Sequence, residues 1–239
     1  MSKPNETWTV LPHGKLEQLD DNIWTVTGQM SMPIGDFPRR MTVVRLASGG
    51  LLIFSAIALD EAKMHELLAL GEPSFLVVPC DRHRMDVKPW KERFPRMRVI
   101  APPGARKKVE ELVPVDDTAP DLGDPRVEFV TMPGTDGHEA ALHVRSASGT
   151  TIIINELVFN VPSKPGFGGW LFDLMGMTGR EPHVPGVVKM RDVKDPAALA
   201  QQLSAWAHED VKRIVVSHGN VIAANAPEVL ARIAHDLAA

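Results

Sequence analysis

The stretch FLVVPCDRHRMD, residues 75–86, ends an apolar run with a concentration of groups that bind metals or act as acids and bases. Within seven residues it carries a thiol, an imidazole and two carboxylates, which are Cys80, His83, Asp81 and Asp86. Such groups ligate transition metals when they gather in one loop. Arg82 and Arg84 lie among them and bring permanent positive charge. The stretch therefore predicts either a metal-binding loop or the remnant of one.

Other polar groups also follow segments that predict strands. The segments 127–132, 151–154 and 213–217 lead into His138, Asn155 with Glu156, and His218. Strand ends that feed loops at one edge of a sheet are where α/β folds build their sites. We therefore expect these groups to meet the loop at 80–86.

The elements that would position them alternate along the chain. Strands are predicted at 41–47, 51–55, 75–78, 98–100, 127–132, 140–145, 151–154 and 213–217, and helices at 60–71, 88–94, 104–112, 197–208 and 227–237. Gly49-Gly50 predicts a hairpin turn, and Asp60 predicts a helix N-cap. Residues 114–125 predict a surface connection, and 162–185 an irregular stretch. This mixture of hairpins and βα units predicts an α/β fold.

Composition narrows the classes of protein. The 239 residues are 44% hydrophobic and 23% charged, which is ordinary globular composition. A net charge of −4 gives no electrostatic case for nucleic acid. One cysteine excludes an internal disulfide, and no apolar run approaches the roughly 20 residues that span a bilayer. We therefore expect a cytoplasmic protein with no nucleic-acid or membrane partner.

Five segments in order carry a resemblance: FPRRMTVVRLASGGLLIFS (37–55), LGEPSFLVVPCDRHRMDVKPWKERFPRMRVIAP (70–102), PGTDGHEAALHV (133–144), TIIINELVFNV (151–161) and VVSHG (215–219). Through these five segments together, the chain resembles the metallo-β-lactamase superfamily. More specifically, it resembles a little-characterised branch of that superfamily, known as a domain of unknown function. The resemblance implies a single domain over residues 1–239, folded as an αββα four-layer sandwich with a metal site at one end.

The superfamily pattern His-x-His-x-Asp-His is absent from the loop. Aligned without gaps, its slots hold Cys80, Arg82, Arg84 and Met85. The branch that the chain resembles instead has a proline, three residues, and then one or two histidines. This places Pro79 and His83 on the pattern.

The remaining ligands implied by the resemblance are also altered. The Gly-His-Thr-x-Gly-His segment has Thr135 in its usual ligand position, with His138 nearby. The bridging aspartate falls on Asn155 or Glu156, and we favour Glu156. The last histidine is His218. The candidate ligands are therefore His83, His138, Glu156 and His218, enough for one ion and few for two.

Two functions remain open. One is a hydrolase of a small-molecule substrate, with a depleted, mononuclear site for zinc or another divalent transition metal. The other is a catalytically inactive domain without metal, which binds an anionic small molecule or acts as a scaffold; Arg82 and Arg84 favour it. A third reading, thiol chemistry at Cys80 with His83 as base, has less support, because a lone cysteine is more often a small buried residue.

The segment 163–185 interleaves aromatic and aliphatic residues with glycines. An apolar, flexible stretch of this kind predicts a lid over a site or a homodimer contact. Packing within the chain is an equal alternative.

Overall fold

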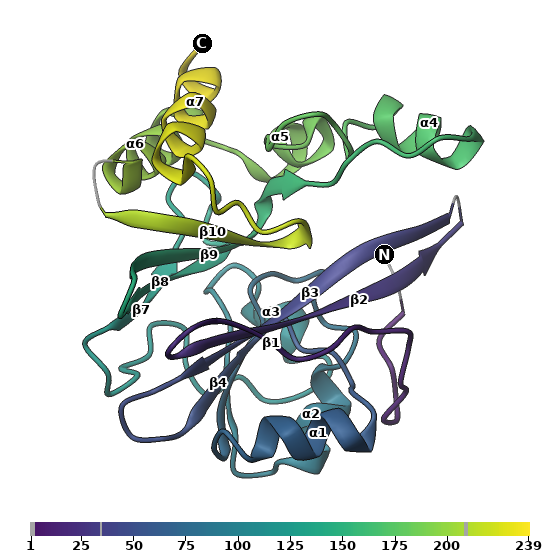
Figure 1. Ribbon diagram of the computed structural model, residues 1–239, viewed down its shortest axis with the longest axis vertical. Coiled ribbons are helices and arrows are strands. Elements are labelled where there is room, and N and C mark those ends of the chain that lie inside the picture. Colours follow the sequence, from purple (N-terminus) through teal and green to yellow (C-terminus); the bar gives the residue numbers. More distant parts are fainter. Residues whose placement is uncertain (1–2, 34, 208–209) are drawn as a thin grey trace.

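The computed structural model describes residues 3–33, 35–207 and 210–239, in which two β-sheets lie face to face with helices outside (Figure 1). The first sheet has the order β1-β2-β3-β4-β5-β6, and the second has the order β10-β9-β8-β7. Apolar side chains of both sheets meet between them, among them Leu52, Phe54, Leu142, Ile153 and Val215. The predicted αββα arrangement is therefore confirmed.

The first sheet is built by the first half of the chain. Its strands are β1 (Glu17–Asp20), β2 (Ile23–Met32), β3 (Gly35–Arg45), β4 (Leu51–Phe54), β5 (Pro73–Val77) and β6 (Arg98–Ile100). Neighbours are antiparallel up to β4 and parallel from β4 to β6. Because the other sheet covers one face and helices the other, β4 is buried at every position.

The second sheet consists of β7 (Val127–Thr131), β8 (Ala140–Ser146), β9 (Gly149–Asn160) and β10 (Val211–Gly219). Strands β9 and β10 run parallel, and the other pairs are antiparallel. The parallel pair brings the end of β10 beside the second half of β9.

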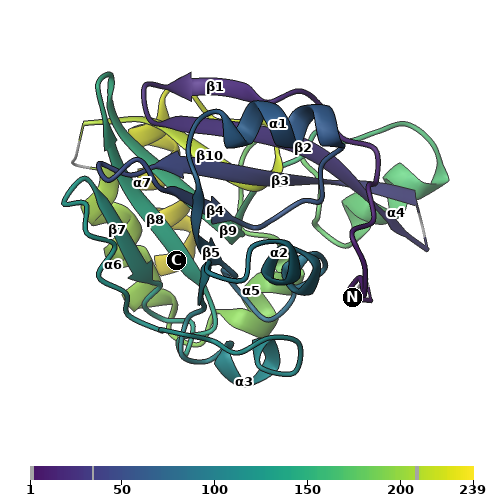
Figure 2. The ribbon, with the colours of Figure 1, turned by 90° about the horizontal axis from the view of Figure 1, so that it is seen from below.

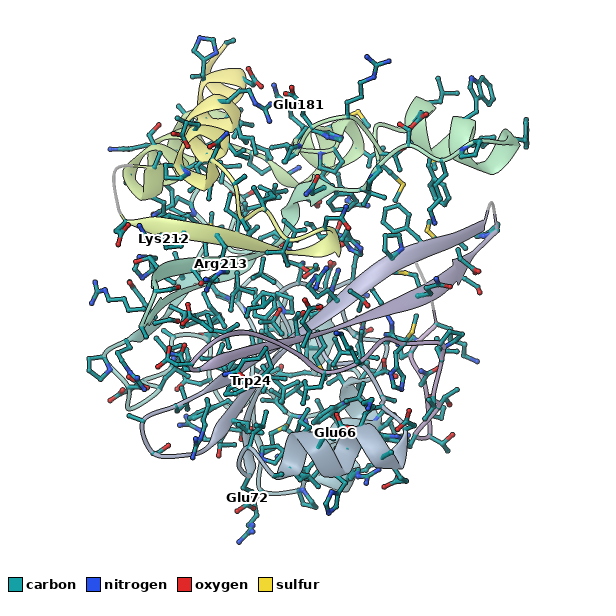
Figure 3. All side chains as sticks on the ribbon, in the orientation of Figure 1. Trp24, Glu66, Glu72, Glu181, Lys212 and Arg213 are labelled. Atoms are coloured by element: carbon teal, nitrogen blue, oxygen red, sulfur yellow. The ribbon has the colours of Figure 1, made fainter. Side chains whose placement is uncertain are left out.

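Helices form the outer layers. On the first sheet lie α1 (Glu61–Leu68), α2 (Val87–Arg93) and the short α3 (Arg106–Val109); on the second lie α6 (Pro196–Ala207) and α7 (Ala226–Ala238). Their buried residues join two further cores, one with Met64 and Trp90 and one with Leu203 and Leu230. Side chains fill these layers, while Glu66 and Glu72 lie on the outside (Figure 3).

Two short helices lie between β9 and α6, namely α4 (Phe167–Leu174) and α5 (Gly186–Asp192). Figure 2 shows α4 on the same side of the molecule as the far ends of β2 and β3. The contact is direct, because the rings of Phe37 in β3 and Phe172 in α4 lie 5.1 Å apart.

The structure corrects several predicted bounds. Strands β1 and β2 were not predicted, β3 begins at residue 35 instead of 41, and the stretch 162–185 contains α4. Asp60 caps α1 as predicted, since its carboxylate accepts a hydrogen bond from the backbone N–H of Lys63 at 2.8 Å. The helix predicted at 197–208 spans Pro196–Ala207, and His208 lies outside the described residues. Within the described part of the chain, every helix is too short or too polar to cross a membrane.

Candidate metal centre

Three chain segments meet at one end of the sandwich. His83 lies in the loop after β5, Glu156 lies within β9, and His218 lies near the end of β10. The pairing of β9 with β10 is interrupted there, because Val216 pairs with Ile154 while His218 pairs with Phe159. Irregularities of this kind redirect side chains, and here one adjoins Glu156.

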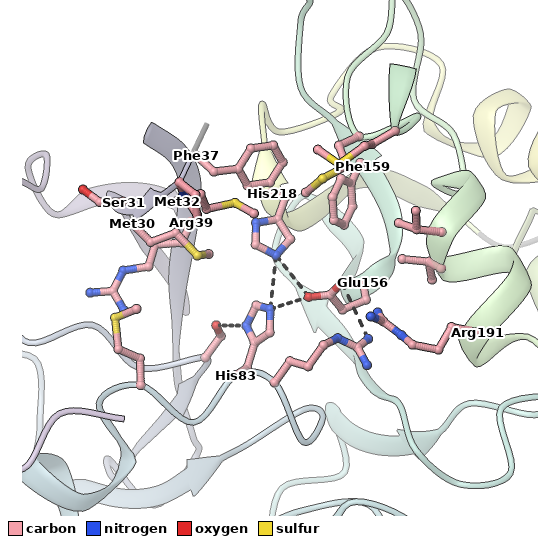
Figure 4. A pocket seen from close by; sticks show the side chains of 18 of the residues that line it. Met30, Ser31, Met32, Phe37, Arg39, His83, Glu156, Phe159, Arg191 and His218 are labelled. Carbon is pink, nitrogen blue, oxygen red and sulfur yellow. Dashed lines mark hydrogen bonds and ion pairs between the residues drawn. The ribbon is translucent and has the colours of Figure 1, made fainter. Parts of the chain in front are cut away.

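His83, Glu156 and His218 form a triad of closely spaced atoms (Figure 4). His83 Nε2 lies 2.9 Å from Glu156 Oε1 and 3.1 Å from His218 Nε2. His218 Nε2 lies 3.3 Å from the same carboxylate oxygen. We call this group the histidine–glutamate triad.

Hydrogen bonds behind the two rings decide which nitrogens carry protons. His218 Nδ1 lies 2.7 Å from the carbonyl oxygen of Pro38, and a carbonyl only accepts, so Nδ1 carries the proton. In the neutral ring Nε2 is then an acceptor. His83 Nδ1 lies 2.7 Å from the hydroxyl of Ser55, which can donate or accept. The three facing atoms of the triad are therefore all potential acceptors. When both rings are neutral, at most one proton lies among these atoms, and it is on His83 Nε2.

The pKa values of Glu156 and His83 are shifted toward the protonation states that bind metals. Burial raises the pKa of Glu156, but the two histidines beside its Oε1 outweigh burial and hold that pKa well below its usual value. Burial lowers the pKa of His83, which favours the neutral ring. A carboxylate and neutral imidazoles are the protonation states that metals require.

The donor set fits a divalent transition metal. Ligand atoms 2.0–2.1 Å from a tetrahedral zinc ion lie about 3.3 Å apart, and the three separations here are 2.9, 3.1 and 3.3 Å. Two histidines with one carboxylate form a common ligand set for zinc and for non-haem iron. The backbone carbonyl and the hydroxyl behind the rings are also partners of the kind that orient metal-binding histidines.

A guanidinium lies beside the triad without entering it. Arg82 Nη2 lies 2.9 Å from Asp192 Oδ2, 3.1 Å from Glu139 Oε1 and 3.6 Å from Glu156 Oε2. Arg82 Nη1 lies 3.3 Å from Asp81. We call Arg82 with Asp81, Glu139, Glu156 and Asp192 the arginine cluster. Glu156 belongs to both groups, because its Oε2 faces Arg82 and its Oε1 faces the two histidines of the triad.

The other charged residues of the loop point elsewhere. Arg84 donates to the carbonyl oxygen of Lys108 and lies 3.1 Å from Glu111. Asp86 is buried and accepts from Arg39 at 2.6 Å. Of the two loop arginines, Arg82 alone therefore competes for the carboxylates of the site.

Cys80 is fully buried, as a small apolar residue would be. Burial raises the pKa of its thiol well above the ordinary value, which disfavours a nucleophilic thiolate. Its sulfur accepts a hydrogen bond from Asn155 Nδ2 at 3.2 Å. The sulfur still forms a looser candidate ligand set with His83 and Glu156, with all atoms within 4.8 Å of one another.

The structure does not bring His138 into this group. The turn before β8 has positive φ at Gly134 (76°), Asp136 (50°) and Gly137 (72°), and it leaves His138 exposed. The next residue, Glu139, is buried and turns toward Arg82. Among the described residues, no side-chain interaction joins His138 to the triad, so the geometry gives no support to its predicted role as a ligand.

Three residues of the site were not predicted. Glu139 and Asp192 hold Arg82, and Ser55 holds His83. Ser55 is the last residue of the strand predicted at 51–55, and this position at a strand end was a signal in the sequence. In the structure it directly follows β4 and has an unusual φ of 57°. Asp192 gave no such signal, since it lies in a helix 110 residues away from Arg82.

The triad lines a cavity of about 430 Å³. Its apolar wall comes from β2, β3, β9 and the segment around α4 and α5, with Met30, Met32, Phe37, Phe159, Met175 and Val187. Arg39, Arg82 and Arg191 supply positive charge. This size and this mixture of apolar wall and few polar groups are usual for small-molecule sites.

The arrangement of sheets and helices matches that of metallo-β-lactamases. A DIM-1 metallo-β-lactamase exposed to ceftazidime gives a TM-score of 0.64 at 14% identity, with 95% of this chain and 99% of that chain covered. The FIM-1 metallo-β-lactamase from Pseudomonas aeruginosa, in a mono-zinc form, gives a TM-score of 0.62 at 14% identity, with 95% of this chain and 96% of that chain covered. A metallo-β-lactamase from Hirschia baltica gives a TM-score of 0.58 at 11% identity, with 92% of this chain and 97% of that chain covered.

No family model matches the sequence, and no curated protein matches it. At such low identities the structural likeness shows the fold alone. The chemistry of the site has to be argued from its own residues.

Proposed function

We propose that the protein is a metal-dependent hydrolase of a small molecule, with a single divalent transition metal held by His83, Glu156 and His218. One observation carries the proposal: three ligand atoms from three distant segments lie within 3.3 Å of one another, and their residues line one cavity. Zinc is the first candidate, because two imidazoles and a carboxylate suit it and leave a position open.

Each residue has a defined task in this scheme. A divalent ion bound there supplies Lewis acidity, which lowers the pKa of water and polarises a scissile bond. His218 and His83 present their Nε2 lone pairs, and Pro38 and Ser55 fix the orientation of the rings. Glu156 contributes negative charge, and the apolar wall holds the body of the substrate away from bulk water.

Metal analysis of the purified protein tests the proposal. We expect close to one equivalent of zinc, iron or manganese in the wild type, and little in His218→Ala. His138→Ala is the matched control, because it removes an exposed histidine outside the triad. A panel of esters, amides, lactones and phosphoesters should then show hydrolysis that a chelator abolishes. Wild-type protein that takes up no transition metal from solution would defeat the proposal.

A catalytically inactive, anion-binding domain is the second candidate. The observation in its favour is the three arginines that line the cavity, of which Arg191 is half exposed at 51%. Acetate and inorganic phosphate, titrated into chelator-treated protein, would distinguish the two functions. Binding that persists without metal and weakens in Arg191→Ala supports this candidate, provided that no substrate is hydrolysed when metal is present.

We also propose that the apolar face of α4 covers the site or contacts a second copy of the chain. Phe167, Trp170 and Leu174 are 77%, 56% and 71% exposed, while Phe172 on the same helix is buried. Gel filtration of wild type and of Phe167→Ser/Trp170→Ser tests the second option. A monomer in both cases, together with unchanged substrate affinity, would contradict both options.

A further inference from the structure

One nitrogen atom of Arg82 is surrounded by carboxylate oxygens from three segments of the chain. Nη2 lies 2.9 Å from Asp192, 3.1 Å from Glu139 and 3.6 Å from Glu156. All three carboxylates are buried, with side chains between 1% and 10% exposed. Carboxyl groups this close together cannot all be charged unless a cation lies among them, because their mutual repulsion is weakly screened inside a protein.

The guanidinium also divides the two oxygens of Glu156. Oε2 faces Arg82, and Oε1 faces His83 and His218. Since a positive charge on one side attracts one oxygen, the carboxylate presents the other to the histidines. The orientation of this ligand therefore depends on Arg82.

We propose that Arg82 is a positioning residue which aims Glu156 at the two histidines and occupies a place where a second divalent cation would otherwise bind. Because Glu156 belongs to both groups, the first half of this role rests on the proposed function. The second half rests only on the carboxylates around Arg82.

The surroundings of the guanidinium suit a metal ion as well. Three carboxylates form the oxygen-rich environment that divalent cations prefer. Asn155 is fully buried and donates through Nδ2 to Glu139 at 3.1 Å, while its side-chain oxygen lacks a hydrogen-bond partner among the described residues. That oxygen is a buried neutral acceptor, on a side chain that contacts Glu139, which the guanidinium does not use.

Zinc counting on the intact protein tests the role. Chelator-treated wild type, Arg82→Ala, Arg82→His, Arg82→Lys and Arg84→Ala are dialysed against zinc, and bound metal is measured by mass spectrometry. We expect one equivalent in wild type and two in Arg82→Ala and Arg82→His. Arg82→Lys should keep one, because its ammonium group also places a positive charge among the carboxylates.

Arg84→Ala is the matched control. It removes the same charge from the same loop, but Arg84 points toward Lys108 and Glu111, away from the carboxylates. We expect one equivalent of zinc, as in wild type. A second equivalent in Arg84→Ala would show that loop charge in general, and not the place of Arg82, limits metal uptake, and would overturn the role.

The counts separate this role from the proposed function. No zinc in wild type and one equivalent in Arg82→Ala would defeat the mononuclear hydrolase and leave Arg82 as an occupant of a cation site. One equivalent in wild type, Arg82→Ala and Arg82→His alike would agree with the mononuclear hydrolase and would defeat the role of Arg82 as the occupant of a second cation site. Thermal unfolding with and without zinc tests Arg82→Ala and Arg82→His if they fold poorly. We expect zinc to restore their folding. Variants that stay unfolded in the presence of zinc would contradict the proposed role of Arg82.

Discussion

The histidine–glutamate triad and the arginine cluster lie side by side and share Glu156, yet they are built on opposite principles. In the triad, acceptor atoms face one another, with at most one proton among them when the rings are neutral. In the arginine cluster, carboxylates face a donor that is always charged. In the proposed function the first arrangement takes its cation from solution, whereas the second carries its positive charge in the chain. Two adjacent residues of one loop, His83 and Arg82, make this difference.

Glu156→Gln should have the largest effect, because it is the residue that both groups use. The amide keeps the shape but removes the charge that faces the histidines and Arg82. We expect zinc affinity to fall at least about a hundredfold, more than outer-shell changes cause, and stability to fall by about 3 kcal/mol. Calorimetric titration with zinc and urea unfolding measure the two effects.

Glu128→Gln is the matched control for that change, because Glu128 is exposed on β7 of the same sheet. It should shift stability by no more than about 0.5 kcal/mol. Equal losses in both variants would mean that Glu156 has no special place between the two groups.

The pKa values of the two buried glutamates should be shifted in opposite directions. Burial, followed by the negative charge of Glu156, raises the pKa of Glu139 to about 8, while the pKa of Glu156 is lowered. A raised folded-state pKa means that folded protein keeps a proton which unfolded protein releases above about pH 4.5. Stability from Glu139 is therefore present at low pH and is lost as pH rises toward 8, by on the order of a few kcal/mol.

Glu139→Gln removes this titration and mimics the protonated side chain. Urea unfolding of metal-free wild type and variant at pH 5.5, 7 and 8.5 should show a stability difference that favours the variant increasingly with pH. A difference that stays constant over this range would place the titration elsewhere.

Much of the fold could be predicted because local pattern and burial agree. The strands Leu51–Phe54 and Arg98–Ile100 and the cap at Asp60 follow from short apolar runs and one N-cap residue. Strand β2 was missed because its second half is largely exposed, so its sequence, IWTVTGQMSM, loses the apolar character that marked the others. Tertiary pairing with β3 determines that strand.

The site was predictable to a different extent. His83, Glu156 and His218 could be proposed because each follows or lies in a strand-like segment of the resemblance, and the structure brings them together. Their metal-binding role stays a prediction. The partners of Arg82 could not be foreseen, because Asp192 comes from an unpredicted helix and because one step along a turn separates exposed His138 from buried Glu139.

Ser55→Ala should weaken the triad and leave the arginine cluster intact. The hydroxyl of Ser55 is the partner of His83 Nδ1 at 2.7 Å. Loss of such an outer partner costs about 10–100-fold in metal affinity. Zinc titration should show this loss, and Ser74→Ala, which changes a half-buried serine of β5 outside the triad, should show none. Unchanged affinity in Ser55→Ala would mean that the ring of His83 is held by its other contacts.

Cys80→Ala should have the smallest effect on metal binding and decides which atoms complete the site. If the triad holds the metal, zinc affinity stays within about twofold of wild type, because the sulfur then only accepts from Asn155. The lost packing of a buried thiol should cost about 1 kcal/mol of stability. If the sulfur is a ligand instead, zinc binding drops sharply, and cobalt-substituted wild type shows a sulfur-to-metal charge-transfer band that the variant lacks. That outcome would move the metal from between the two histidines toward Cys80. The sulfur lies on the side of Asn155 and Glu139, next to the arginine cluster. The triad and the arginine cluster would then no longer be separate sites, one for a metal from solution and one for the charge of Arg82.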